Sequence, residues 1–336
     1  MERNFKVVFF MGKGGVGKTT CAAAFALGVS TKRKTLIVSL DPAHNLGDVF
    51  DVKLGDVPKR ITDNLYAVEV DFEKMISKHL KSLTDKVKDI YGYLRVLNLD
   101  RYIDVLRHSP GIEEYATLDK IMEILKSNVR SGKYDIIVFD TPPTGLTLRI
   151  MALPSISAIW IEKLMKLREA ILDRRRIIEE ITGEKIKAVI KGEEFEIPSG
   201  KEEDPIYKEL IHMKREIDFI NSIIKDSKVS MAVLVVNPEV LPIFEAKRAL
   251  EFLSKLGISV QYVIVNKVLE ISEMASLPKE LMTKLNQERE ALQLINNYFK
   301  EQVVINIPLF YEEPKGLDKL TAFSKYLSKL INNVVI

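Results

Sequence analysis

A glycine-rich segment near the start of the sequence carries its clearest chemical signal. It follows an apolar run and ends in Lys18-Thr19, which gives the pattern G-x-x-x-x-G-K-T. In such a loop the glycines let backbone N–H groups face an anion, the lysine reaches the β- and γ-phosphates, and the threonine hydroxyl binds Mg²⁺. The pattern therefore predicts a nucleoside triphosphate site. Its predicted residues are Gly12, Lys13, Gly14, Gly15, Val16, Gly17, Lys18, Thr19 and Thr20.

A second lysine, Lys13, stands early in the same loop. An ordinary phosphate loop needs one lysine, and a second cation near a triphosphate can neutralise charge that develops during transfer. We therefore predict Lys13 and Lys18 as catalytic residues. Two interpretations stay open, because Lys13 can cross to the nucleotide of a second chain or can help only its own site.

Two acids follow apolar runs further along the chain. Phosphoryl transfer depends mainly on positioning and charge neutralisation, so one carboxylate that orients a water molecule is sufficient. Asp41 is predicted in this catalytic role, and capping a helix or holding Mg²⁺ through water are its alternatives. Asp140 is predicted to lie near Mg²⁺, so the predicted metal set is Thr19, Asp41 and Asp140. Prolines 142 and 143 and Gly145 favour a segment that moves when the γ-phosphate is lost.

Short apolar runs alternate with helical patterns over much of the chain. The runs are rich in β-branched residues and nearly free of charge, as expected of parallel strands that are covered on both faces. The sequence therefore predicts an α/β fold, a doubly wound parallel sheet with its ligand at the carboxyl ends of the strands. The predicted strands are 6–11, 34–40, 65–70, 134–139, 231–236, 261–265 and 303–307.

Two long stretches exceed a minimal sheet-and-helix unit, and we expect one domain over 1–336 with a helical subdomain from insertions at about 71–130 and 151–228. The first has a seam of apolar residues at steps of three and four. The second is apolar on more than one helix face, so its helices pack on each other or bind something apolar. Polar residues 191–205 predict a mobile excursion. The seam residues are Ile76, Leu80, Leu83, Val87, Ile90, Leu94 and Leu97.

Composition excludes several classes of protein. The formal net charge is +3, with 29% charged residues of both signs interspersed, which is no signature of nucleic-acid binding. Cys21 is the only cysteine, so one chain holds neither a disulfide nor a cysteine metal site. There is no N-terminal signal pattern and no run of 18 uncharged apolar residues. We expect a soluble, cytoplasmic protein.

The segment Asn266-Lys267-Val268-Leu269 bears on the choice of base. It is similar to the guanine-reading motif N-K-x-D, but leucine stands where that motif needs an acid. The Asn266 amide can pair with N6 and N7 of adenine, whereas Leu269 cannot accept a hydrogen bond from guanine. The sequence therefore favours ATP over GTP.

Three ordered signatures now point to one family. The loop form 13–19, the segment 41–46 (Asp-Pro-Ala-His-Asn-Leu) and the segment 140–145 together resemble the arsenite-pump and tail-anchored-protein-targeting ATPases, the ArsA and GET-pathway family. Segments 109–114 and 307–317 extend the resemblance over nearly the whole chain. It implies a phosphate-loop fold of the deviant (SIMIBI) class with helical insertions.

The resemblance also implies partners and site residues. In this family Lys13 would contact the partner's nucleotide, Asp41 would serve hydrolysis, and the helical insertions of a homodimer would form an apolar groove. The groove would hold the transmembrane helix of a client protein, with a membrane receptor as a further partner and no nucleic acid. Further implied nucleotide contacts are Asn45, Glu239, Asn266, Pro308 and Phe310. The predicted groove residues are Ile156, Trp160, Ile161, Leu164 and Met165.

The chain also departs from the family pattern. Gly47 and Leu146 stand where the family usually has serine and histidine, and residues 270–289 lack the zinc-binding cysteine pair. We therefore expect ATP and Mg²⁺ as cofactors and no zinc. The cysteines that bind arsenite and the second fused ATPase half are absent as well. Because a soft metalloid prefers thiolate ligands, we do not expect an arsenite-pump ATPase.

The preferred hypothesis is thus a dimeric ATPase that carries the hydrophobic segment of a tail-anchored membrane protein and releases it on nucleotide turnover. A partitioning or division ATPase (MinD/ParA-like) is the alternative, and it would need a basic face or a terminal membrane-binding helix. The C-terminal stretch 322–336 is amphipathic but carries only two lysines, so we expect it to pack on the sheet. A nucleotide-switched scaffold without cargo is the third possibility.

Overall fold

The structure, a computed structural model, describes residues 5–43, 45–90, 106–107, 109–190, 193–269 and 278–335. His44 of the 41–46 signature and Leu94 and Leu97 of the apolar seam lie outside these residues. The chain divides into two compact units. Unit 1 consists of Met1–Phe72, Lys120–Met151 and Ile223–Ile336, and unit 2 consists of Glu73–Asp119 and Ala152–Ser222.

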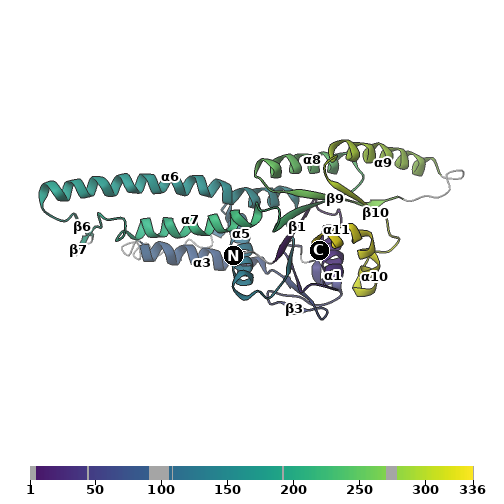
Figure 1. Ribbon diagram of the computed structural model, residues 1–336, viewed down its shortest axis with the longest axis horizontal. Coiled ribbons are helices and arrows are strands. Elements are labelled where there is room, and N and C mark those ends of the chain that lie inside the picture. Colours follow the sequence, from purple (N-terminus) through teal and green to yellow (C-terminus); the bar gives the residue numbers. More distant parts are fainter. Residues whose placement is uncertain are drawn as a thin grey trace. The chain divides into compact units, whose positions relative to one another are not determined.

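Unit 1 is built on an eight-stranded sheet of order β10-β9-β8-β1-β5-β2-β4-β3 (Figure 1). Neighbouring strands are parallel except at the β3 edge, where β3 pairs antiparallel with β4. The predicted doubly wound α/β sheet is confirmed. Its strands are β1 (Lys6–Gly12), β2 (Thr35–Ser39), β3 (Lys59–Arg60), β4 (Leu65–Glu69), β5 (Ile136–Asp140), β8 (Ser230–Val236), β9 (Val260–Val268) and β10 (Val303–Pro308).

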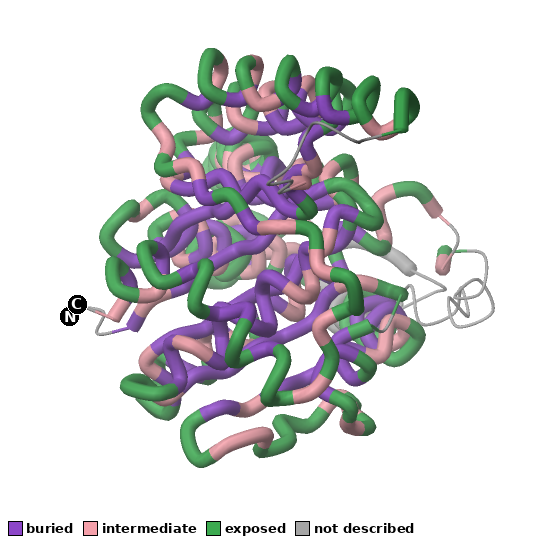
Figure 2. The backbone as a smooth tube through the Cα atoms, turned by 90° about the vertical axis from the view of Figure 1, so that its right-hand side faces the viewer, coloured by how far each residue is buried: buried purple, intermediate pink, exposed green. Residues whose placement is uncertain are grey.

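The central strand β1 shows why both sheet faces are covered. Side chains alternate between the two faces of a strand, so adjacent phenylalanines point in opposite directions. Phe9 stacks on Phe139 of β5 at a ring distance of 5.1 Å, while Phe10 meets Phe25 of the following helix at 5.4 Å. Figure 2 shows the buried sheet strands in purple between helices whose outer turns are exposed. The chain leaves β1 for β2 on one side of it and later crosses from β5 to β8 on the other side, and such a switch creates the crevice where these sheets bind ligands.

One group of unit 1 helices packs around α1 (Figure 1). Gly28 of α1 allows a close approach, because a Cβ there would lie 2.4 Å from Cδ1 of Ile331. The C-terminal stretch packs against α1 and also contacts the strand β10, so the expected packing on the sheet is confirmed in part. The unit 1 helices are α1 (Lys18–Val29), α2 (Leu46–Phe50), α8 (Val240–Lys255), α9 (Lys279–Tyr298), α10 (Gly316–Ser324), a 3₁₀ turn (Lys325–Leu327) and α11 (Ser328–Val335).

Unit 2 is mainly helical, and α5, α6 and α7 each belong in part to both units. Ile161 and Leu172 of α6 are buried in it, as are Ile76 and Leu80 of the predicted seam, whereas Leu83 is exposed. The elements are α3 (Phe72–Ile90), α5 (Ile112–Ser131), α6 (Thr144–Thr182), α7 (Pro205–Ile224) and the antiparallel pair β6 (Lys187–Ile190) and β7 (Glu193–Glu196).

The predicted excursion at 191–205 contains regular structure and side-chain contacts in the part that the structure describes, which its polar composition did not indicate. Strand β7 pairs with β6, and the segment behind it is tied to α6 by polar side chains. The Ser199 hydroxyl donates to Glu179 at 2.5 Å, and Arg168 Nε donates to the fully buried Asp204 at 3.0 Å. These contacts join residues about twenty to forty positions apart, which a local polar composition cannot reveal.

Helix α6 is long and apolar enough to cross a membrane by length and composition, and it is the one such helix among the described residues. About a third of its most apolar window is buried. A single helix of this kind does not make a membrane protein, because the core helix of a soluble protein has the same properties.

Candidate active site

The carboxyl ends of β1, β2, β5, β9 and β10 bring most of the predicted nucleotide residues to one edge of the sheet. A cavity of about 600 Å³ opens there, a size typical of small-molecule sites. It lies within unit 1. The predicted residues that line it are Lys13, Gly14, Gly15, Gly17, Lys18, Thr19, Thr20, Asp41, Asn45, Asn266, Pro308 and Phe310.

The phosphate loop joins β1 directly to α1. Gly15 and Gly17 have φ values of +83° and +89°, which a residue with a Cβ adopts only with strain. A Cβ on Gly17 would also lie 2.2 Å from the amide nitrogen of Asn266. This glycine is therefore required by backbone conformation and by the close approach of β9, and it directs the N-terminus of α1 at the cavity.

Lys18 is 5% exposed and lies between two acids. Its ammonium donates to Asp41 at 2.8 Å and lies 3.5 Å from Asp140. A buried ammonium is tolerated only when it is paired in this way. The Thr19 hydroxyl donates to the second oxygen of Asp140 at 2.8 Å, so the four predicted chemical groups form one connected cluster.

Asp140 is completely buried at the end of β5. Burial raises the pKa of its carboxyl group, although the neighbouring Lys18 and the Thr19 hydroxyl oppose the increase. Its Oδ1 atom is buried and accepts no hydrogen bond from the described residues. A carboxylate oxygen with spare coordination beside a threonine hydroxyl fits Mg²⁺, which binds through one or two such groups together with phosphate oxygens. Within the described residues, no group of three or more His, Cys, Asp and Glu side chains is arranged to hold a metal ion by itself.

The segment after Asp140 is pinned by hydroxyl groups. Thr141 donates to the carbonyl oxygen of Phe10 in β1 at 2.8 Å, and Thr147 donates to Pro142 at 2.6 Å. Thr147 lies on the first turns of α6, so this chain of contacts leads from β1 through the acid segment into that helix. Movement of the segment would require these buried hydrogen bonds to change partners.

Glu69 is a residue of this edge that sequence reasoning missed. Its carboxylate accepts hydrogen bonds from the backbone N–H groups of Leu46 and Gly47 at 3.0 and 3.3 Å. It thereby anchors the N-terminus of α2, directly after the Asp41 segment, where a negative charge is favoured. The sequence feature that could have pointed to Glu69 is its position as an acid at the end of an otherwise mostly apolar strand. Gly47 has a local reason as well, because a Cβ there would lie 2.9 Å from the carbonyl oxygen of Val52.

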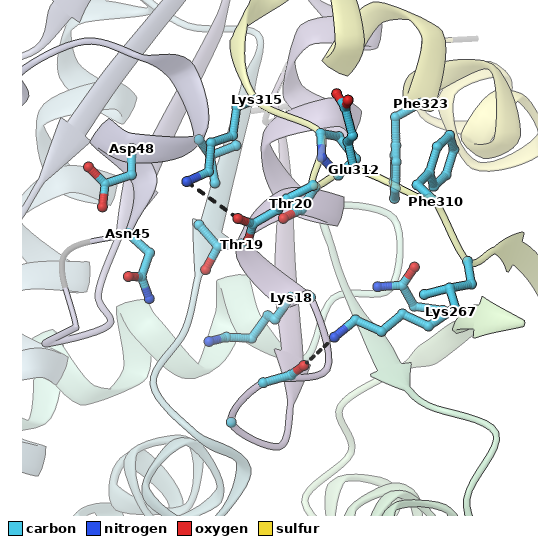
Figure 3. Close-up of a pocket in the computed structure, with 18 of the residues that line it drawn as sticks. Lys18, Thr19, Thr20, Asn45, Asp48, Lys267, Phe310, Glu312, Lys315 and Phe323 are labelled. Carbon is cyan, nitrogen blue, oxygen red and sulfur yellow. Dashed lines mark hydrogen bonds and ion pairs between the residues drawn. The ribbon is translucent and has the colours of Figure 1, made fainter.

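The opposite end of the cavity has an aromatic wall (Figure 3). Phe310 stacks on Phe323 at a ring distance of 5.3 Å and meets Tyr326 edge-on at 5.7 Å. Asn266, also predicted to contact the base, is buried and donates its amide to the carbonyl oxygen of Val16 at 2.8 Å. One N–H of that amide is therefore already used by the phosphate loop.

Of the remaining predicted residues, Glu239 lies outside the nucleotide cavity, and Lys13 lines the cavity but is held by a contact with another helix. Glu239 lines a neighbouring cavity of about 610 Å³, which shares Lys267 and Leu309 with the nucleotide cavity. Lys13 lines the nucleotide cavity but extends to Glu245 on α8 at 3.3 Å, and both side chains are nearly half exposed. Such an exposed pair holds its partners weakly.

The predicted groove residues on α6 differ in their exposure. Trp160 is 66% exposed, Leu164 is 45% exposed and Met165 is partly buried. Ile161, in contrast, is only 4% exposed. Ile161 thus contributes to the core of unit 2, whereas an exposed stripe runs along the helix. We define this apolar stripe as Ile156, Ile159, Trp160, Leu164 and Leu167.

Comparison with known proteins agrees with this geometry. Residues 5–329 match the anion-transporting ATPase family, ArsA. An arsenical pump-driving ATPase homologue of Aquifex aeolicus (strain VF5) is 33% identical over 326 residues, which cover 96% of this chain and 99% of that protein. The ATPase get3 of Neurospora crassa is 30% identical over 333 residues, covering 98% and 92%. The ATPase get3 of Pyrenophora tritici-repentis is 29% identical over 331 residues, again covering 98% and 92%.

The cluster around Lys18 and the family match lead to the same reaction. A phosphate loop, a buried acid beside its threonine and a second acid on its lysine are the parts that phosphoryl transfer to water needs. The chain belongs to the anion-transporting ATPase family, and its enzymatic activity is the hydrolysis of ATP.

Proposed function

We propose that this ATPase works as a homodimer that shields the hydrophobic transmembrane segment of a tail-anchored membrane protein in the cytoplasm and releases it on ATP turnover. The observation that carries the proposal is the apolar stripe on α6, where five large apolar side chains are exposed. Exposed apolar residues at helical spacing mark a binding surface. The similarity to proteins named get3 supports the choice of client.

The nucleotide step follows from the Lys18 cluster. The γ-phosphate is a stronger partner for a buried ammonium than a carboxylate, so ATP would take Lys18 away from Asp41. Asp41 would then be free to orient the attacking water. Thr19 and Asp140 would hold Mg²⁺, whose role is to neutralise charge on the phosphate oxygens. Lys13, a mark of the deviant phosphate loop, would leave its weak pair with Glu245 and reach the nucleotide of the partner chain.

The client step follows from the size of the apolar stripe. A transmembrane segment of about 20 apolar residues is too hydrophobic to stay in water alone. Burial of its surface against exposed isoleucine, leucine and tryptophan side chains contributes roughly 25 cal/mol for each Å² removed from water. An aspartate within the stripe would leave a charge buried without a partner and would weaken binding by about tenfold or more.

A peptide-binding experiment tests this proposal. A fluorescent tail-anchor peptide is titrated with the Asp41→Asn chain in the presence of ATP or ADP, and with the same chain carrying Trp160→Asp or Leu164→Asp. Lys166→Asp is the matched control, because Lys166 is an exposed residue of the same helix outside the apolar stripe. We expect tight binding with ATP, weaker binding with ADP, and loss only in the two stripe variants.

Equal affinity with ATP and ADP, or equal loss in all three variants, would contradict the targeting proposal while leaving the ATPase assignment intact. Binding of DNA or liposomes by the unmodified chain in a sedimentation assay would instead favour the partitioning or division alternative. A partner that binds only in the ATP state and ignores the stripe variants would favour the scaffold.

A further inference from the structure

Two consecutive residues near the end of β9 hold two consecutive carbonyl groups of the phosphate loop. Asn266 donates to the carbonyl oxygen of Val16 at 2.8 Å, and the Lys267 ammonium donates to that of Gly15 at 3.0 Å. Figure 3 shows the Lys267 side chain reaching across to the loop. Each contact joins residues about 250 positions apart in the sequence. We call this pair of contacts the β9 clamp.

Because the peptide bond is planar, the β9 clamp also sets the direction of the N–H groups that face the anion site. In a trans peptide the C=O of one residue and the N–H of the next point in opposite directions. Drawing the carbonyl groups of Gly15 and Val16 toward β9 therefore turns the N–H groups of Val16 and Gly17 the other way. The N–H of Val16 makes only a long contact of 3.5 Å with the Lys13 carbonyl oxygen, so it can turn toward a phosphate.

The backbone at Lys267 is strained at the position from which its side chain contacts the phosphate loop. Its φ is +63°, a left-handed conformation that costs free energy in any residue with a Cβ. Asp51 is the other non-glycine residue with positive φ among the described residues, and it ends helix α2, a common place for this conformation. Lys267 lies inside a strand and has no such explanation.

The pairing of β9 with β10 is irregular at the same place. The register shifts between Asn306 and Pro308, opposite Asn266 and Lys267. Irregular pairing of this kind re-aims side chains near functional sites. The Lys267 side chain is exposed and lines the nucleotide cavity, so packing against a core does not account for its position.

We propose that Lys267 is a positioning residue for ATP hydrolysis, which holds the Gly15–Val16 part of the phosphate loop so that its N–H groups face the phosphates. This role goes beyond the residues of the phosphate-loop motif and does not depend on the client. Because the loop binds the phosphates in the ground state and in the transition state alike, loss of the clamp lowers affinity and leaves the chemical step nearly unchanged.

Steady-state kinetics and nucleotide titration test the proposal. Lys267→Met keeps the length of the side chain and removes the donor. We expect KM for ATP and Kd for ADP to rise about fivefold to tenfold, the effect of one hydrogen bond, with kcat within about twofold of the unmodified enzyme. Lys267→Arg keeps a donor and should restore affinity. Lys32→Met is the matched control, an exposed lysine beyond the far end of α1.

A third variant separates positioning from stability. Lys267→Gly removes the donor and also the strain, so it should bind ATP as weakly as Lys267→Met yet melt about 2 °C or more above it. Unchanged ATP and ADP affinity in Lys267→Met would overturn the proposal. So would a tenfold loss of kcat at constant KM, a Lys267→Arg variant no better than Lys267→Met, or an equal effect of Lys32→Met.

Discussion

The phosphate-loop edge of unit 1 and the apolar stripe of unit 2 differ in how their side chains are partnered. At the edge, polar groups are buried and already bound to each other, as in the contacts of Lys18 with Asp41 and Asp140. In the stripe, large apolar groups such as Trp160 and Leu164 face water. The polar groups of the edge are thus partnered within the chain itself, whereas the stripe gains its stabilisation only when something covers it.

This difference predicts opposite responses to substitution. Changes at the edge should act on the rate of hydrolysis and reach a hydrophobic partner only through the nucleotide state, and changes in the stripe should weaken the partner's binding directly with little effect on stability. The chain itself links the regions, because Asp140 is followed by three residues and then by α6, the helix that carries the stripe. Four predictions test the contrast.

The largest expected effect is on the rate of ATP hydrolysis by Lys13→Ala. A cation that reaches the transferring phosphate contributes on the order of 10³-fold or more, so kcat should fall by about that factor while ADP affinity changes little. Mixing Lys13→Ala with Lys18→Ala chains distinguishes the two interpretations of Lys13. Activity returns in mixed dimers only if Lys13 acts on the partner's nucleotide, and a mixture without activity would assign it to its own site.

The next effect is on hydrolysis by Asp41→Asn. The amide keeps the size of the side chain but orients water poorly, so we expect a loss of about 10²-fold in kcat. ATP binding should be retained or strengthened, because Lys18 loses the competing carboxylate 2.8 Å away. Single-turnover hydrolysis and ATP titration measure the two quantities. Full activity of this variant would remove Asp41 from the mechanism.

A pair of neighbouring residues on α6 sharpens the other side of the comparison. Ile161 is 4% exposed and Trp160 is 66% exposed. Ile161→Ala should lower the free energy of unfolding by about 2 kcal/mol through the cavity it leaves, and Trp160→Ala should change it by less than about 0.5 kcal/mol. Urea unfolding followed by circular dichroism measures both. Similar losses in the two variants would mean that the stripe is part of a folded core.

The smallest effect concerns the ion pair that holds the end of the β6–β7 excursion. Burial acts to raise the pKa of Asp204, but Arg168 and the Tyr207 N–H outweigh it and hold the pKa below the ordinary value of 3.8. A lowered pKa stabilises the fold at pH values above the ordinary one, and this contribution disappears as the pH falls through the lowered value.

Arg168→Met should therefore cost about 1.5 kcal/mol at neutral pH, and the difference from the unmodified chain should shrink in acid. Urea unfolding followed by the fluorescence of Trp160, the only tryptophan and a residue of unit 2, gives the measurement. A difference that stays constant from neutral pH into acid would exclude the Asp204 carboxylate as its source.

The elements that can be predicted from the sequence are those whose conformation is determined by their own residues. Strand β8 is a short charge-free run, and β5 is a short apolar run that ends in the acid Asp140. Strand β3 is only Lys59–Arg60, an exposed charged pair at a sheet edge, and its pairing is set by β4. Strand β7 is a charged segment as well, and its place depends on its pairing with β6.

The candidate site divides in the same way. The phosphate loop and its two acids are visible as motifs, because spacing and residue type alone define that chemistry. Lys267 and Glu69 are not, since each acts on a backbone group far away in the sequence and needs the strand order to be known. The burial of Ile161 beside the exposed Trp160 likewise depends on which face of α6 the rest of unit 2 covers.

The composition of α6 has a practical consequence for the purified protein. An exposed helix with the apolar content of a bilayer span tends to associate with other apolar surfaces, including the same helix on another molecule. Concentrated samples without a client should therefore form soluble oligomers that a mild detergent disperses. Detergent monomers should also compete with the proposed client for the apolar stripe. Detergent in a purification buffer would then reduce the client binding that we propose for this helix.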